Sequence, residues 1–197
     1  PVRNPCGGRI VATHETSLYD EWGVRCKDFG LGDLFGARFA GKVDGPVRNS
    51  YLNLEADPAT GRRHALLEGL DDASRIIHGV NQVRATPMRA GVRAPLTEVP
   101  SYPDLPMEEV YPRVARTDSP GVYLNDSSGT RVVYFPWDID RTFWEVLNPD
   151  HGRLLGNAVA WASDERQPAT VEGPGVLDIA VWRQEQSLTV HLVTLTN

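Results

Sequence analysis

The 197-residue sequence predicts an α/β fold, and three observations indicate it. Residues 9–13 form a short β-branched run after two glycines, which is typical of a strand buried on both faces of a parallel sheet. Residues 131–135 form a second apolar run. A helical repeat of apolar residues then follows the Asn148-Pro149 pair. Strand, loop and helix in this order make an α/β half-unit.

The segment between these two strands predicts further short elements separated by turns. A glycine-rich stretch contains a short helix near 28–36, and residues 64–70 form a helical turn that ends in glycine. Turn signals such as Asp57-Pro58, Thr86-Pro87 and Ser119-Pro120 separate the strand candidates. We expect those strands at residues 50–55, 75–85, 96–102 and 120–125.

The second half-unit carries the clearest local signals. Residues 136–141 are expected to form the loop at the carboxyl end of the strand at 131–135. Asn148 is placed to cap the next helix, and Pro149 fits its first position. The helix then buries apolar residues at helical spacing, namely Leu154, Leu155, Ala158, Val159 and Ala162.

A change in composition after Trp161 predicts a domain boundary. Residues 164–168 are polar, and Gly173-Pro174-Gly175 interrupts any continuing element. We therefore expect an α/β domain at 1–166 and the start of a β-rich module at 167–197. In that module residues 176–182 and 188–192 alternate apolar and polar about a turn, as in an antiparallel hairpin. A lone hairpin is marginally stable in water, so this one should pack on a further surface.

Composition excludes several classes of function. The net charge of -6 and the pI near 5.4 give no basic surface for nucleic acid. No stretch approaches the ~20 apolar residues of a membrane span, and the first residues lack the apolar core of a signal peptide, so a cytoplasmic protein is expected. Cys6 and Cys26 are too few for a disulfide scaffold or a closed zinc site. The sequence predicts no metal and no cofactor.

Both ends of the sequence suggest a piece of a longer polypeptide. The chain begins without Met, and residues 188–197 stop within a strand-like run. On this interpretation the sheet is truncated at its N-terminus, which leaves strand edges or apolar faces to be covered by partners.

Three stretches, at residues 11–23, 100–112 and 133–145, resemble a bacterial family of glycoside-hydrolase-like proteins. In that family a (β/α)₈ barrel precedes a domain similar to the trimerisation domain of β-galactosidases. The resemblance falls on this second domain and implies a three-layer sheet like that of class I glutamine amidotransferases, which is flavodoxin-like. It also implies self-association, for instance as a trimer, or contact with a neighbouring barrel, and carbohydrate as a further partner.

The amidotransferase fold permits a direct test for catalytic residues. An active enzyme places a Cys nucleophile after one strand and a His/Glu pair after another. Here His14 and Glu15 follow the first strand, and Trp137 and Asp138 follow the later one. Cys6 precedes the first strand and Cys26 lies well beyond its turn. We therefore expect no catalytic residue in this chain.

Three groups of polar residues remain as candidate sites, each with a structural alternative. The loop after the first strand carries His14, Glu15, Tyr19, Glu21 and Trp22, which either bind and stack on a sugar or pack against a neighbouring domain.

The loop after the later strand carries Trp137, Asp138, Asp140 and Arg141, with His151 beyond it. Its carboxylates either hold a metal or act as acid and base, or Arg141 forms an ion pair that fixes the loop.

The proline-rich segment around Tyr111 carries Glu108 and Glu109, which resemble a glycosidase acid pair. Adjacent residues of an extended segment point to opposite faces, so a rigid exposed loop is the favoured interpretation.

These observations leave three hypotheses for function. The first is a non-catalytic assembly or scaffold domain of a carbohydrate-active hydrolase. The second is an enzyme that processes a small sugar at the strand ends, as in trehalose-utilisation-type proteins. The third is a sugar-binding module without chemistry.

Overall fold

The computed structural model describes residues 8–89, 94–101, 106, 108–109, 114, 117–163, 169–173 and 175–195. The chain divides into two compact units, residues 1–163 and 164–197. The first is a mixed α/β unit and the second contains a β-hairpin. Each unit is described by itself.

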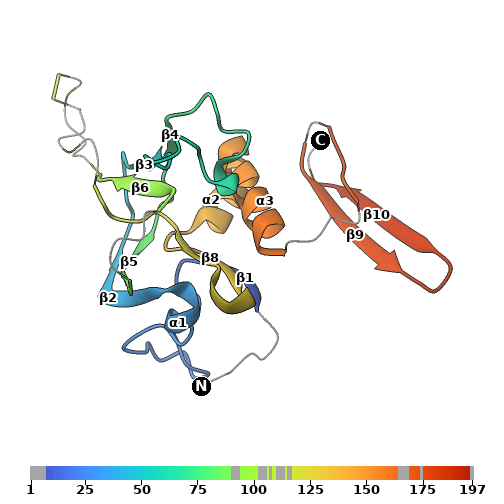
Figure 1. Cartoon of the computed structure of the whole chain (residues 1–197), viewed down its shortest axis with the longest axis horizontal. Helices are drawn as coiled ribbons and strands as arrows, with labels where there is room; N and C mark the ends of the chain where they lie inside the picture. The colour runs from blue at the N-terminus through green and yellow to red at the C-terminus, as the bar shows by residue number, and fades with distance from the viewer. Residues whose placement is uncertain are drawn as a thin grey trace. The chain divides into compact units, whose positions relative to one another are not determined.

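The centre of the first unit is a three-stranded sheet in the order β1-β8-β7. Figure 1 labels two of its strands, β1 and β8. Strand β1 (Arg9–Thr13) runs parallel to β8 (Arg131–Phe135), and β7 (Tyr123–Asn125) is antiparallel to β8. Successive side chains of a strand point to opposite faces. Accordingly Val133 and Phe135 enter one core cluster, and Val132 and Tyr134 enter the other. Strand β8 therefore separates the two halves of the core.

One core half is built from helices and a second sheet. Helix α3 (Pro149–Ser163) packs on β1, β8 and the short helix η1 (Ala65–Leu67), and α2 (Ile139–Val146) packs on α3. The second sheet has the order β4-β3-β6, formed by Arg75–Ile77, Tyr51–Leu54 and Leu96–Val99. Leucines from these elements fill the space between them.

The other core half is aromatic. Helix α1 (Gly32–Phe35) and the antiparallel pair of β2 (Ala37–Asp44) and β5 (Gln82–Pro87) contribute to it. Phe35 stacks on Tyr134 with ring centroids 4.3 Å apart, and Phe29 meets both rings edge to face. Such pairs contribute about 0.5–1.5 kcal/mol beyond simple burial. A further short helix, η2 (Ser127–Gly129), connects β7 to β8.

Most predicted elements lie close to their expected residues, and three expectations need correction. The segment 75–85 contains two strands, β4 and β5, rather than one. Strand β1 is not buried on both faces, because it lies at the sheet edge and only Ala12 among its residues is buried. Of the strand pairings among the described residues, only β1 with β8 is parallel.

The predicted loop at 136–141 is also wrong in part, because α2 begins at Ile139. The sequence did not indicate this helix for two reasons. The helix is only eight residues long, and its exposed outer face includes the apolar residue Trp144. It ends at Leu147, which adopts a left-handed backbone with φ 49° and donates its N–H to Phe143 O at 2.7 Å. A new helix starts two residues later, capped by Asn148, whose Oδ1 accepts from the N–H of Asp150 at 2.9 Å.

Two glycines of α3 provide an opposed pair of substitutions. A Cβ at Gly156 meets nothing within 4 Å, whereas a Cβ at Gly152 would lie 2.8 Å from Phe143 Cε2. Alanine restricts the unfolded chain and favours helix by about 0.5–1 kcal/mol relative to glycine. We expect Gly156→Ala to raise the free energy of unfolding by that amount and Gly152→Ala to lower it. Urea denaturation checks both, and equal shifts for the two variants would contradict the packing of α2 on α3.

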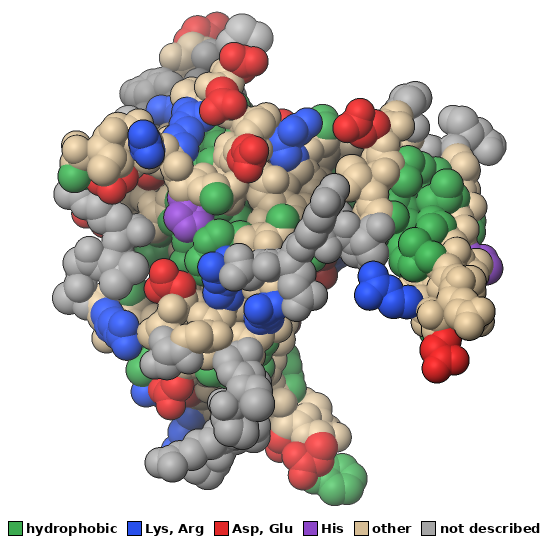
Figure 2. Space-filling view, turned by 45° about the vertical axis from the view of Figure 1, so that its right-hand side comes forward, with side chains coloured by type: hydrophobic (Ala, Val, Ile, Leu, Met, Phe, Trp, Pro, Cys, Tyr) green, Lys and Arg blue, Asp and Glu red, His purple; other side chains and the backbone are tan. Residues whose placement is uncertain are grey.

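The second unit contains a hairpin with one strongly apolar face. Strand β9 (Leu177–Arg183) pairs antiparallel with β10 (Leu188–Thr194), with Ile179 opposite Leu192 and Val181 opposite Val190. Residues directly opposite share a face, and so do alternate residues of one strand. The apolar hairpin face is defined by Leu177, Ile179, Val181, Leu188, Val190 and Leu192, with Arg183 and Thr194 at its two ends. Figure 2 shows hydrophobic side chains gathered on the hairpin, at the right of the view.

Candidate functional site

The two predicted strand-end segments lie side by side. Because β1 and β8 are parallel and in register, Thr13 pairs with Phe135 at their carboxyl ends. The N–H of His14 then donates to Phe135 O at 2.8 Å. The residues after Thr13 and those after Phe135 therefore begin from neighbouring positions at one sheet edge.

In the first segment, His14 and Glu15 are held by local contacts. His14 adopts a left-handed backbone with φ 47°, and its carbonyl accepts from the Tyr134 hydroxyl at 2.7 Å. Glu15 Oε1 accepts from the Tyr19 hydroxyl at 2.7 Å and from Arg25 Nη2 at 3.2 Å. The Arg25 guanidinium also lies 5.8 Å from the Tyr19 ring centre. The carboxylate of Glu15 is thus engaged in a local ion pair.

Two further candidates of this segment face solvent. Trp22 is 84% exposed, and Glu21 is also exposed. Their turn is fixed by Asp20, whose Oδ1 accepts from the N–H groups of Trp22 and Val24. An exposed indole beside a tyrosine is available for stacking, but the residues of this segment line neither of the two cavities described below.

In the second segment, Trp137 and Asp138 are buried rather than open to a ligand. Segment 136–138 pairs with the start of β5, because Pro136 O accepts from the N–H of Val83 at 2.6 Å. Trp137 is fully buried, and its Nε1 donates to Gly121 O at 2.9 Å. The pairing with β5 is a non-local contact, so nothing in the local sequence indicated the burial.

The polar partner of Asp138 is Asn81. Its carboxylate accepts from the backbone N–H of Asn81 at 2.9 Å and from the side-chain amide of Asn81 at 2.6 Å. Arg141 pairs instead with Glu145 at 2.8 Å, four residues along α2, and Asp140 is exposed. The expectation was that Asp138 or Asp140 pairs with Arg141 or another nearby cation, but Arg141 pairs with Glu145, and among the described residues neither aspartate forms an ion pair with a cation.

The remaining sequence candidates form no assembled site among the described residues. Glu108 and Glu109 are exposed, and Tyr111 lies outside the described residues, as does Cys6. Cys26 is a free, partly buried thiol. Within the described part of the chain, no group of three or more His, Cys, Asp or Glu side chains is arranged to hold a metal ion.

A buried Ser/His pair has the wrong hydrogen-bond direction for nucleophilic catalysis. Ser50 Oγ lies 3.0 Å from His78 Nδ1 and 2.9 Å from Val99 O. The carbonyl oxygen can only accept, so the single hydroxyl proton of Ser50 goes to Val99 O. His78 then donates to Ser50 and cannot remove its proton. The chemistry of an activated serine requires the opposite arrangement.

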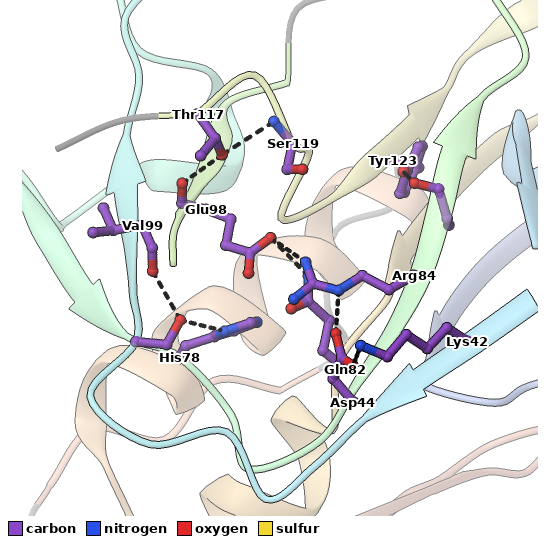
Figure 3. A network of polar contacts seen from close by, with 12 residues as sticks. Lys42, Asp44, His78, Gln82, Arg84, Glu98, Val99, Thr117, Ser119 and Tyr123 are labelled. Carbon is purple, nitrogen blue, oxygen red and sulfur yellow. Dashed lines mark hydrogen bonds and ion pairs between the residues drawn. The ribbon is translucent and has the colours of Figure 1, made fainter. Parts of the chain in front are cut away.

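The sequence did not indicate a partly buried ion network, in which Glu98 is the buried member. Arg84 contacts Asp44 through Nε and Glu98 Oε2 through Nη1, the latter at 2.6 Å, and Figure 3 shows its guanidinium between the two carboxylates. Lys42 adds a contact to Asp44 at 2.5 Å. Burial raises the pKa of Asp44, but hydrogen bonds from Lys42 and Arg84 outweigh it and lower the pKa overall. The network joins β2, β5 and β6.

The structure also contains two cavities that sequence patterns did not predict. One, of about 360 Å³, lies beside Phe35, Pro87 and Tyr123. The other, of about 570 Å³, is lined by residues near Ser50 and His78, by the end of α2 and by His151 of α3. The second gathers residues from segments far apart in the chain, so no local motif could have indicated it.

The comparisons with known proteins give no relative for this chain. No protein-family model matches it, and neither a curated protein nor a solved structure matches it. Among the described residues, every helix is too short or too polar to cross a lipid bilayer.

Proposed function

We propose that the chain is a non-catalytic assembly module of a carbohydrate-active protein, and that it acts through self-association of its hairpin. The apolar hairpin face is the observation that carries this proposal. A two-stranded sheet without a helix cannot cover its own apolar face. Here Leu188, Val190 and Leu192 are 51%, 42% and 54% exposed.

The chemistry of this face favours a second copy of the same hairpin as its partner. Arg183, opposite Leu188, is the charged residue of this face and lies at its turn end, so the six apolar residues form a continuous uncharged area. An uncharged apolar face is complementary to another face of the same kind, and two such sheets pack about 10 Å apart. Burying a Leu or Val side chain contributes about 1.5–3 kcal/mol, so several such residues from each copy would support association.

The strand-end segments support the non-catalytic part of the proposal. Glu15 is paired with Arg25, Asp138 accepts from Asn81, and Trp137 is buried. These contacts are structural. The carbohydrate part of the proposal rests on the family resemblance of residues 11–23, 100–112 and 133–145.

The alternative of a sugar-binding module has one observation in its favour. Tyr19 is exposed and contacts the Glu15–Arg25 pair, and Trp22 is exposed in the same segment. Sugar recognition uses such a combination. Support for it is weaker, because no described cavity adjoins these side chains.

The assembly proposal predicts that one side of β10 controls association and the other does not. Leu192→Lys places a charge on the apolar hairpin face, whereas Val193→Lys places the same charge on the opposite face, next to Asp178. We expect the full chain to self-associate as its concentration rises. Leu192→Lys should weaken association at least about tenfold, which corresponds to ~1.4 kcal/mol, and Val193→Lys should leave it unchanged.

Sedimentation velocity across a wide concentration range measures this difference. A parent chain that stays monomeric throughout would contradict the proposal. A monomeric parent whose thermal stability falls only in Leu192→Lys would show that the face is covered within one chain.

A further inference from the structure

The hairpin of the second unit has a second face, opposite to the apolar one, which is polar around a single tryptophan. Side chains alternate along a strand, so every residue between those of the apolar hairpin face points to the other side of the sheet. We call this side the polar hairpin face, and the strand register assigns to it Asp178, Ala180, Trp182, Thr189, His191 and Val193. Trp182 is 65% exposed, so its indole is open to a partner.

The turn extends this face beyond the strands. The N–H of Gln184 donates to Ser187 O at 2.9 Å, which continues the pairing one step past Arg183 and Leu188. The Ser187 hydroxyl donates to Gln184 Oε1, also at 2.9 Å, so these two side chains lie on the same side. Because side chains alternate along each strand, this step belongs to the same face as Trp182.

The register therefore defines what surrounds the indole. Thr189 is directly opposite Trp182, where Cβ atoms are about 4.5–5.5 Å apart, and Ser187 and His191 are diagonal neighbours at roughly 7–8 Å. Gln184 is the next residue of this face toward the turn. All four neighbours are exposed. An amide, two hydroxyls and an imidazole thus flank the indole, and none of these neighbours is Asp, Glu, Lys or Arg.

Ala180 keeps one side of the indole open. It precedes Trp182 on this face of β9 and lies opposite His191. Its side chain is a single methyl group, so a ligand that stacks on the indole can extend toward His191 without displacing a large side chain.

This arrangement fits a neutral, flat ring that carries hydroxyl groups at its rim. The indole offers a large apolar surface to a flat partner. The flanking amide and hydroxyl groups can both donate and accept hydrogen bonds at the edge of such a ring. A pyranose with equatorial hydroxyls has this shape, because its two faces consist of C–H groups. A proline-rich peptide docks instead in a groove lined by several aromatic residues, and Trp182 is the one Phe, Tyr or Trp among the residues that define this face.

We propose that the polar hairpin face binds a gluco-configured oligosaccharide, with one sugar ring stacked on the Trp182 indole and its hydroxyls bonded to Gln184, Ser187, Thr189 and His191. This inference goes beyond the assembly proposal, because it uses the opposite side of the hairpin. Two hairpins that associate through their apolar faces would leave both polar hairpin faces outward.

Titration of the full chain with cellotetraose tests the site. Calorimetry measures the affinity, and the ¹⁵N–¹H signal of the Trp182 indole shows where the sugar binds. We expect a saturable shift of this signal. Trp182→Ala should weaken binding at least about tenfold, because one aromatic anchor supplies most of the contact. Trp22→Ala, which removes an exposed tryptophan of the first unit, should leave the affinity unchanged.

A second pair of variants tests the site without removing the tryptophan. Thr189→Val deletes a hydroxyl next to the indole, whereas Thr194→Val makes the same change at the end of the apolar hairpin face. Thr189→Val should weaken cellotetraose binding about threefold or more, the range for a lost hydrogen bond, and Thr194→Val should not. Leu192→Lys should bind like the parent, so failure of the assembly proposal would leave this result intact.

Four outcomes overturn the inference. Cellotetraose gives no saturable shift of the Trp182 indole; Trp22→Ala loses binding as much as Trp182→Ala; the two threonine variants bind alike; or a proline-rich peptide binds the face and cellotetraose does not. The cross-strand contact between Val181 and Val190, measured by NMR, checks that the hairpin persists in each variant.

Discussion

Replacing Trp137 by alanine is expected to lower the free energy of unfolding by about 3–5 kcal/mol, the range for removing a buried aromatic side chain. The ring is fully buried and packs edge to face against Phe135, His78 and His151. The substitution also removes the donor to Gly121 O. The residue belongs to the core half that contains Val133 and Phe135 of β8.

Trp22 is the matched control, since both tryptophans belong to candidate sites predicted from the sequence. Trp22→Ala should change stability by no more than about 0.5 kcal/mol, as is usual for an exposed side chain. Urea denaturation compares the two variants. If Trp137→Ala does not fold, Trp137→Phe should show a smaller loss in the same direction. If Trp137→Ala and Trp22→Ala had the same free energy of unfolding, the burial of Trp137 after β8 would be contradicted.

Acidification is expected to destabilise the protein through His78. The unfolded side chain titrates near 6.5, and burial lowers the pKa in the folded protein to about 4. Between these values the unfolded state binds more protons, so the free energy of unfolding falls as the pH falls from about 6.5 to about 4. The loss is on the order of 3 kcal/mol, and it is absent above the unfolded pKa. His151 shifts in the same direction.

His78→Gln isolates this contribution. Arg84, Asp138 and His151 influence the same ring and remain in the variant, so the difference between parent and variant reports His78. We expect the stability of the variant to depend less on pH than that of the parent across this window, as measured by urea denaturation at about pH 7 and about pH 4.5. Parallel pH profiles would show that His78 is not the group that titrates.

Local patterns predicted the elements well where the signal was contained in a few neighbouring residues. The cap at Asn148 and the apolar spacing of α3 are examples, and the alternation of the hairpin is another. The strand-end residues were harder to predict, because their environment depends on long-range pairing. Nothing near Trp137 in the sequence indicates that Val83 donates a hydrogen bond to the preceding residue. Arg141 forms its ion pair with Glu145 because helix α2, which the sequence did not predict, places residues four apart on one face.

Buried polar residues were the other part that sequence could not predict. Glu98 lies in a strand whose four residues are all buried, and its carboxylate is tolerated there because Arg84 and Gln82 reach it from β5. The pairing of His78 with Ser50 likewise joins residues from different strands or strand ends. The tertiary fold brings such partners together from distant parts of the chain. For the same reason the sequence did not indicate the cavity near His78.

The pairing of β1 with β8 has a consequence for how the chain reaches its native state. Arg9 meets Arg131, so most of the first unit, but not α2 and α3, lies in the loop that this contact closes. Closing a long loop carries an entropic cost before any contact is gained, and topologies dominated by distant pairs fold slowly. Hairpin β9–β10 has the opposite character, since a turn of a few residues joins its strands. During synthesis, residues 9–13 emerge first yet must wait for their partner strand, while the hairpin can form as soon as its own residues are free.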